Sequence, residues 1–301
     1  MSSPLAPSVV THRDKKGGKF MDIIADAYDK AMLLEGEAQR VNETAGLADL
    51  VGKFISDNRC ANRFAGEEKD SSCTYPPGYT GPKPIEEQIT GLAKILGLDP
   101  TSALAFAKNL PALPEGAEGW FAIPSTVALA AKLFPNLTDP AEQNFAGVSL
   151  ILSMVAASRD FSDYLLGPIE TTQLRVATRT AGALVQITEA QDMSDILIIA
   201  AQFGLLHRGE SVRRAREVMD ANQFGLGALA VGSMLLTHPE RLQHYDYLWI
   251  DCAGDEFSPG PDGEFGSVPC FNFSHGRVEF DTCSISDSSA YCGSASAFLP
   301  Q

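Results

Sequence analysis

The sequence lacks the short motifs that identify many common enzymes and metal proteins. It has no G-x-x-x-x-G-K-[ST] phosphate loop and no G-x-S-x-G turn of the kind that carries a serine nucleophile. Its six cysteines include no C-x-x-C pair, so the ligand spacing of a zinc ribbon is missing. No apolar run reaches the ~20 residues that a membrane-spanning helix needs. A P-loop enzyme, a common serine hydrolase, a zinc ribbon and a helical membrane protein are therefore not expected.

Basic residues are few. The chain has 23 Lys and Arg against 38 Asp and Glu, which gives a formal net charge of -15. Such a body repels the phosphate backbone of nucleic acid, so nucleic acid is not an expected partner. The acidity either keeps the protein soluble or forms a surface that binds a basic protein partner. Composition leaves both interpretations open.

The first 21 residues contain no apolar core of the kind found in secretory signals. We therefore expect a cytoplasmic protein whose cysteines are reduced and mostly buried. Cys60 and Cys73 form the one pair for which a disulfide is worth testing.

Apolar spacing divides the chain into three regions. Residues 1–18 are polar and predict a flexible leader. Residues 19–158 are mainly helical by their 3.6-residue periodicity, with a Pro- and Gly-rich loop or linker at 59–84 and a short strand at 120–123. Residues 170–301 alternate strand and helix signals. The helices expected in the second region lie at 19–58, 85–96, 102–109, 125–133 and 140–158.

The last region predicts a mixed sheet. The apolar run 196–200 is typical of a buried central strand, 211–221 indicates a helix, and 226–236 and 247–250 are expected to be strands, which together predict a parallel βαβ unit. Residues 172–187 are ambiguous and favour a helix, although 184–187 alternate like a strand. Alternation at 271–273 and 278–280 around a short turn predicts a terminal β-hairpin. The fold class is α+β or α/β, with a helical N-terminal part packed beside the C-terminal sheet.

An arginine-rich run leads from the 196–200 strand into the helix that begins after Ser211. Free N–H groups at a helix start favour an anion, and guanidinium groups have forked donors that suit phosphate or carboxylate. Internal pairing is the alternative, for example Arg213 with Glu217 one helical turn away. The candidate ligand-binding residues are His207, Arg208, Ser211, Arg213 and Arg216.

Catalytic and metal-ligating candidates follow further along the chain. His238 precedes a proline at a predicted turn and has the ordinary pKa of a general base, although a surface histidine is the alternative. Asp251, Asp255 and Glu256 follow the 247–250 strand and offer oxygen ligands for Mg²⁺, although acidic and glycine residues are also typical of turns.

Five runs carry a resemblance: residues 119–124 (Gly-Trp-Phe-Ala-Ile-Pro), 201–204, 207–216, 235–242 and 248–252. Together they resemble a group of hypothetical proteins found in bacterial genomes and mobile elements. The resemblance covers roughly residues 84–301. It implies a bacterial cytoplasmic origin and transfers no activity and no catalytic residue.

Two functions follow from these residues. The first is a non-catalytic binding or regulatory protein that holds a protein partner or a small anionic ligand through its acidic surface and its arginine-rich run. The second is a metal-assisted hydrolase or transferase acting on a phosphorylated substrate. In the second, the arginines bind the anion, His238 is the base, and Asp251 with Asp255 holds Mg²⁺.

Overall fold

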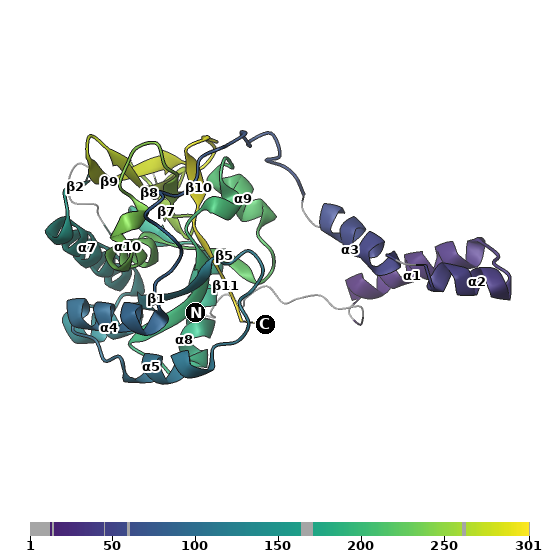
Figure 1. Ribbon diagram of the computed structural model, residues 1–301, viewed down its shortest axis with the longest axis horizontal. Coiled ribbons are helices and arrows are strands. Elements are labelled where there is room, and N and C mark those ends of the chain that lie inside the picture. The colour runs from purple at the N-terminus through teal and green to yellow at the C-terminus, as the bar shows by residue number, and fades with distance from the viewer. Residues whose placement is uncertain are drawn as a thin grey trace. The chain divides into compact units, whose positions relative to one another are not determined.

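The computed structural model describes residues 13, 15–44, 46–58, 61–163, 171–260 and 263–300. The chain divides into a small unit, Leu5–Asn62, and a large unit that contains Arg63–Gln301 (Figure 1). The expected boundary between residues 158 and 170 does not separate two units, because α7 (Pro140–Ser158) packs against elements from both sides of it.

The small unit consists of helices, as expected for this stretch. Its elements are α1 (Lys15–Lys30), α2 (Glu35–Asn42) and α3 (Leu47–Asn58). Helix α1 begins at Lys15, before the expected start at residue 19, and residues 1–12 of the expected leader lie outside the described residues. Phe20 of α1 stacks on Phe54 of α3 with ring centroids 6.4 Å apart, which joins the first helix to the third.

The first half of the large unit confirms the predicted helices and the short strand. Its elements are α4 (Ile85–Leu96), α5 (Thr101–Phe106), η1 (Ala107–Asn109), β1 (Gly119–Pro124), α6 (Thr126–Leu133) and α7. Ser125 caps α6 by accepting a hydrogen bond from the Ala128 N–H. Asp139 caps α7 in the same way, and Pro140 occupies the first helical position, where its missing N–H costs nothing.

Two sheets follow. The first has the order β1-β4-β11-β5, and all its pairs are antiparallel. The second has the order β10-β6-β8-β7-β3, with β9 on β8 and β2 on β9; the pairs β6–β10 and β2–β9 are parallel, so this sheet is mixed. The strands are β2 (Phe161–Asp163), β3 (Leu174–Val176), β4 (Ile196–Gln202), β5 (Gln223–Gly225), β6 (Trp249–Asp251), β7 (Asp255–Phe257), β8 (Ser267–Ser274), β9 (Arg277–Ser284), β10 (Cys292–Ser294) and β11 (Ser296–Phe298).

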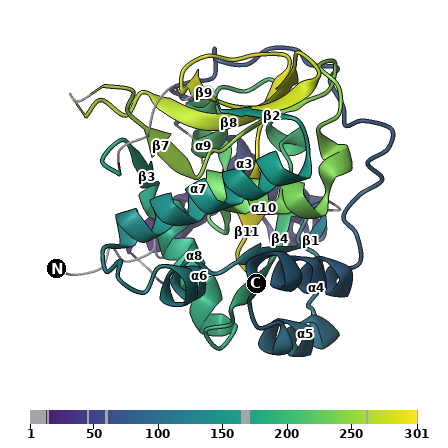
Figure 2. The same cartoon turned by 90° about the vertical axis from the view of Figure 1, so that its left-hand side faces the viewer.

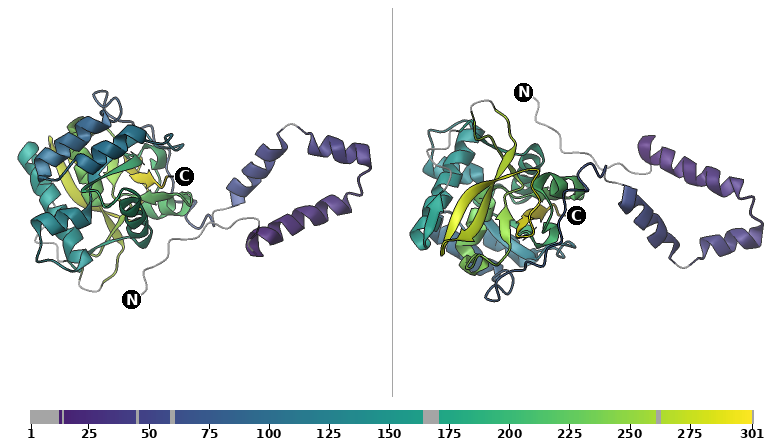
Figure 3. Two further views of the ribbon diagram at one scale, coloured as in Figure 1. Left: turned by 90° about the horizontal axis from the view of Figure 1, so that it is seen from below. Right: turned by 90° about the horizontal axis from the view of Figure 1, so that it is seen from above.

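The terminal hairpin is confirmed. Strands β8 and β9 pair from Ser267↔Ser284 to Ser274↔Arg277. The two turn residues, His275 and Gly276, both have positive φ (51° and 80°), as a tight hairpin turn requires. This hairpin crosses the large unit in yellow-green in the view from above (Figure 3).

The predicted βαβ unit is wrong. Residues 228–237 form helix α10 (Ala228–Thr237), not a strand, and β4 pairs only with antiparallel neighbours. Residues 228–235 of α10 are all buried, so the segment is apolar on every side and carries no periodic signal. Its Ala, Leu and Met residues favour a helix, and Val231 is the single β-branched residue before Thr237.

Helix α10 is central to the core. It packs against α7, α4 and β1, and Figure 2 shows α7 and α10 lying between the second sheet above and the first sheet below. Gly232 lets α7 approach, because a Cβ there would lie 2.6 Å from Ile151. Gly147 of α7 likewise leaves room for Leu229 of α10, because a Cβ at Gly147 would lie 2.5 Å from the Leu229 side chain. The remaining helices are α8 (Thr178–Ala190), η2 (Leu205–His207), α9 (Val212–Val218) and η3 (Pro239–Arg241).

Residues 63–84, which we call the strap, run along the large unit without forming a helix. The strap is held by backbone bonds from Lys69 N to Gly209 O (2.9 Å) and from Leu248 N to Thr74 O (3.1 Å). Cys73 in the strap is a free thiol, and Cys60 lies outside the described residues. Among the described helices, none combines the length and apolar character needed to cross a bilayer.

Candidate functional site

The arginine-rich run lies where the sequence predicted, at the entrance to α9. Ser211 caps the helix, since its Oγ accepts the Arg214 N–H at 3.1 Å. The same hydroxyl donates to the Glu67 carboxylate of the strap at 2.7 Å. His207 is buried, and its ring contacts Glu210 (2.9 Å) and Gln223 (2.7 Å). Ser211 and His207, two of the predicted ligand-binding residues, are therefore both bound to other residues of this chain.

The guanidinium groups are also bound internally. Arg213 forms a forked ion pair with Glu67, whose pKa is lowered chiefly by this hydrogen bond. Arg216 donates to the backbone oxygens of Ala253 (2.9 Å) and Asp255 (2.6 Å). Arg208 donates to an oxygen of the strap, at Cys73 (3.2 Å), and Arg214 pairs with Glu68 and Glu217. Each of the four arginines in the run thus binds a carboxylate or carbonyl of this chain.

His238 is fully buried beside three aromatic rings, those of Tyr79, Phe121 and Phe203. Its Nε2 accepts the Lys83 N–H at 2.9 Å, and its Nδ1 lies 3.1 Å from the Met234 carbonyl, to which it donates. Burial is the main cause that lowers its pKa and keeps the ring neutral. A ring whose lone pair already accepts a backbone N–H has no lone pair left for a substrate proton.

The three predicted oxygen ligands occupy separate environments. Glu256 pairs with Arg175 (2.7 Å) and Arg216 (3.7 Å). Asp255 caps α10 by accepting the Ala228 N–H at 2.6 Å. Asp251, within the described part of the chain, belongs to a group of potential metal ligands whose other members are cysteines.

Two buried charged residues that contact the strap, Arg241 and Glu118, were not among the candidates predicted from the sequence. Arg241 is 0% exposed, donates to the Leu248 (2.8 Å) and Phe203 (3.2 Å) carbonyls, and lies 4.0 Å from the centre of the Tyr75 ring. Glu118 accepts the Tyr75 hydroxyl and the Phe203 N–H. These partners are distant in sequence, so no local pattern predicts them.

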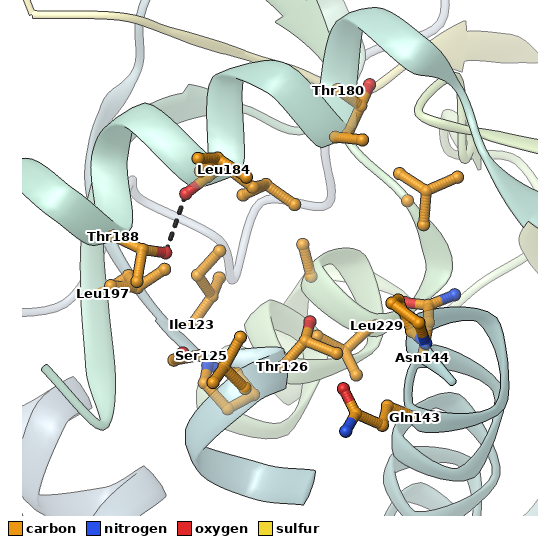
Figure 4. Close-up of a pocket in the computed structure, with 18 of the residues that line it drawn as sticks. Ile123, Ser125, Thr126, Gln143, Asn144, Thr180, Leu184, Thr188, Leu197 and Leu229 are labelled. Carbon is orange, nitrogen blue, oxygen red and sulfur yellow. Dashed lines mark hydrogen bonds between the residues drawn. The ribbon is translucent and has the colours of Figure 1, made fainter. Parts of the chain in front are cut away.

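A pocket of about 460 Å³ opens between α8 and the starts of α6 and α7. Figure 4 shows Thr180, Leu184 and Thr188 of α8 on one side, and Thr126, Gln143 and Asn144 on the other. The apolar wall is completed by Ile123, Leu197 and Leu229. Small-molecule sites typically measure about 300–1,000 Å³ and are mostly apolar with few polar groups.

Several polar side chains that line the pocket form hydrogen bonds with backbone atoms of this chain. Thr188 donates to Leu184 O (2.7 Å), Thr180 donates to Gly225 O (2.8 Å), and Ser125 caps α6. These residues shape the pocket without offering strong anchors.

Two polar residues of the pocket, Asn144 and Asp255, are buried and still have an atom that is unpaired within the described part of the chain. Asn144 is 8% exposed, lines the pocket, and makes no side-chain hydrogen bond with any residue that the structure describes. The Asp255 Oδ2 atom binds Ala228 N, whereas Oδ1 has no hydrogen-bond partner among the described residues. Burial raises the pKa of Asp255 to about 7, so its carboxyl can donate or accept near neutrality. An amide and one carboxyl oxygen therefore have no hydrogen-bond partner among the described residues.

The sequence held one readable signal for this pocket. Asn144 lies four residues before Val148, on the apolar face of α7 that also contains Leu152 and Val155. A polar residue on such a face either finds a partner in the core or faces a cavity.

Comparison of the chain with protein-family models, curated proteins and solved structures found no match.

Proposed function

We propose that this chain is a non-catalytic binding protein whose ligand is a small, largely apolar molecule with one hydrogen-bonding end. The observation that supports this most directly is the pocket of about 460 Å³, which has an apolar wall, an amide with no hydrogen-bond partner among the described residues and a carboxyl with one unpaired oxygen. Asn144 and Asp255 would bind the polar end, and Leu184, Leu197 and Leu229 the apolar body.

A hydroxyl or an amine suits these anchors better than a carboxylate. Asp255 is buried and, when ionised, repels an anion. The Asn144 amide accepts a donor through its oxygen. The described residues that line the pocket include no histidine, cysteine or lysine beside Asp255, and Arg175 is already paired with Glu256, which favours binding over catalysis.

A binding protein was also the first function expected from the sequence, but we now propose the pocket as its site in place of the arginine-rich run. The arginine-rich run supports an anionic ligand less well, because its guanidinium groups already bind Glu67, Glu68 and backbone oxygens. The hydrolase or transferase alternative has less support, because both ring nitrogens of His238 are engaged.

A matched series of probes tests the proposal. Protein with ¹³C-labelled methyl groups is titrated with 2-naphthylmethanol, 2-naphthylmethylamine, 2-methylnaphthalene and 2-naphthoate, and methyl spectra are recorded. We expect the alcohol and the amine to shift the methyl signals of Leu184, Leu197 and Leu229. The hydrocarbon should bind more weakly and the carboxylate not at all, because only the first two give Asn144 and Asp255 a donor.

Variants on α8 are the control. Ala181 lines the pocket, so Ala181→Phe should fill it and remove the shifts. Ala190 is exposed on the same helix and does not line the pocket, so Ala190→Phe should leave them unchanged. The proposal fails if the alcohol shifts the same signals equally in both variants, or if its shifts fall on methyl groups elsewhere.

A further inference from the structure

One face of the second sheet gathers three cysteines and a carboxylate. Asp251 of β6 and Cys270 of β8 are direct cross-strand partners. Cys283 of β9 lies opposite the residue two positions before Cys270. Cys292 of β10 lies beside the residue two positions before Asp251. Side chains on a strand alternate between the two faces, so all four point to the same side.

The four side chains meet at Cys283. Its sulfur lies 2.7 Å from that of Cys270, and one sulfur or oxygen atom each from Asp251, Cys270 and Cys283 lies within 4.8 Å of the others. Cys283 also contacts the Cys292 thiol and the Asp251 carboxyl. Three groups from three strands thus converge on one small volume, and Cys292 of the fourth strand borders it through Cys283 and would move closer when an ion binds.

Asp251 gives a second, independent observation. The residue is 3% exposed, and its Oδ1 is buried with no hydrogen-bond partner among the described residues. Buried polar atoms are rarely left unpaired, since losing water without a new partner is costly. The same carboxyl has an oxygen within 4.8 Å of the Cys270 and Cys283 sulfurs, so a buried and incompletely paired carboxyl borders the thiols.

We propose that Asp251, Cys270, Cys283 and Cys292 bind one Zn²⁺ ion. Zinc prefers four ligands in a tetrahedron and accepts thiolates together with a carboxylate. On binding, the three thiols release their protons to solvent, and three thiolates and one carboxylate surround the dication. All four positions come from the protein, so the ion is structural and leaves no place for a substrate.

The surroundings fit a closed site. The face is covered by α9, whose Val212 and Ala215 form an apolar cluster against which Cys283 packs. Cys283 itself is only partly buried, which gives an ion a route in. In a tetrahedral zinc site two sulfurs lie about 3.8 Å apart, so those of Cys270 and Cys283 separate by about 1 Å when the ion enters.

A Cys270–Cys283 disulfide is the competing interpretation. Its sulfurs would lie about 2.05 Å apart, and the observed 2.7 Å lies between that and the zinc value. A disulfide would leave Cys292 without its thiol partner and would not satisfy Asp251 Oδ1. Zinc accounts for all four groups, so we favour it. The site is separate from the pocket and does not depend on the proposed function.

Metal content and cobalt substitution test the proposal. The full chain, produced without a metal-binding tag and purified under reducing conditions, should contain about one zinc per chain by elemental mass spectrometry. Metal-free protein refilled with Co²⁺ should show thiolate-to-cobalt charge transfer and the visible bands of a tetrahedral site. Asp251→Asn should weaken Co²⁺ binding and keep the charge-transfer band, because three thiolates remain.

Cys283→Ser should lose the bound metal, and Cys73→Ser is the matched control because Cys73 is free and outside the cluster. If Cys283→Ser fails to fold, the wild-type metal content and cobalt spectrum decide alone. The proposal is overturned if reduced wild-type protein takes up neither zinc nor cobalt, if Cys283→Ser retains as much metal as Cys73→Ser, or if freshly isolated protein contains a Cys270–Cys283 disulfide.

Discussion

Replacing Asp255 by asparagine should change how the stability of the large unit depends on pH. Burial raises the pKa of this carboxyl from an ordinary 3.8 to about 7, and the bond from Ala228 N and the nearby Arg216 only partly oppose the rise. Asparagine keeps an oxygen acceptor for Ala228 N and does not titrate in this range.

The sign follows from proton linkage. The folded state binds the proton more tightly than the unfolded chain, so this contribution to stability is fully present below the unfolded pKa and is lost as the pH rises through the folded pKa. A change from 3.8 to about 7 corresponds to about 4 kcal/mol. The free energy of unfolding of Asp255→Asn minus that of the wild type should therefore rise by about 4 kcal/mol between pH 4 and pH 8.

Urea unfolding followed by tryptophan fluorescence measures this difference. The two tryptophans, Trp120 and Trp249, lie in β1 and β6, so the signal reports on the large unit alone. Carboxyl groups with lowered pKa values, such as Glu67 and Glu217, affect both proteins equally and cancel in the difference. A difference that stays constant across the range would mean that Asp255 titrates at its ordinary pKa, and the reasoning from burial would be refuted.

Two further substitutions test the packing and the buried charges. Arg241→Met should lower the free energy of unfolding by about 3–5 kcal/mol, because it leaves Glu118 buried without its positive neighbour. Adding Glu118→Gln to this variant should recover part of the lost stability. No recovery would mean that the two charges do not interact. Gly232→Ala should destabilise by about 1–3 kcal/mol, because its Cβ would meet Ile151 at 2.6 Å. Gly182→Ala on α8 is the control: its Cβ meets nothing within 4 Å, so it should stabilise slightly, and equal effects would contradict the close packing of α7 on α10.

Much of the fold could be predicted where a segment has one buried face. Helix α7 shows its apolar stripe in the sequence, and β8 and β9 alternate around the turn at His275 and Gly276. Prediction failed for α10, because a segment buried on all sides has no periodicity that could distinguish a helix from a strand. The βαβ unit was inferred from that segment, and it failed for the same reason.

The candidate sites were less predictable because their residues are paired over long distances. Glu67 binds Arg213 across 146 positions, and the sequence suggested only the local partner Glu217. The thiol cluster was closer to prediction. Once the hairpin turn is placed, counting back along both strands puts Cys270 and Cys283 on the same face. The contribution of Asp251 and Cys292 depends on strand order, which no local pattern determines.

The arginine-rich run shows how charge in a sequence can mislead. Positive residues in an acidic chain suggest a site for an external anion, yet Arg213 and Arg214 use their charges to hold Glu67 and Glu68 of the strap. A group that already has a partner gains little from a ligand, since it must first release what it holds. A buried group without a partner gains the full interaction, because it has already lost its water.

By this reasoning, both proposed sites are placed at incompletely paired groups and not at the arginine-rich run. Asn144 and Asp255 line the pocket, and the Asp251 carboxyl lies beside the Cys270 and Cys283 thiols. The first two are uncharged or partly protonated near neutrality and border apolar walls, so they suit a small organic molecule. The third faces thiols that become thiolates on binding a metal, so it suits a cation. The ligands proposed for the two sites therefore differ because the groups around them differ.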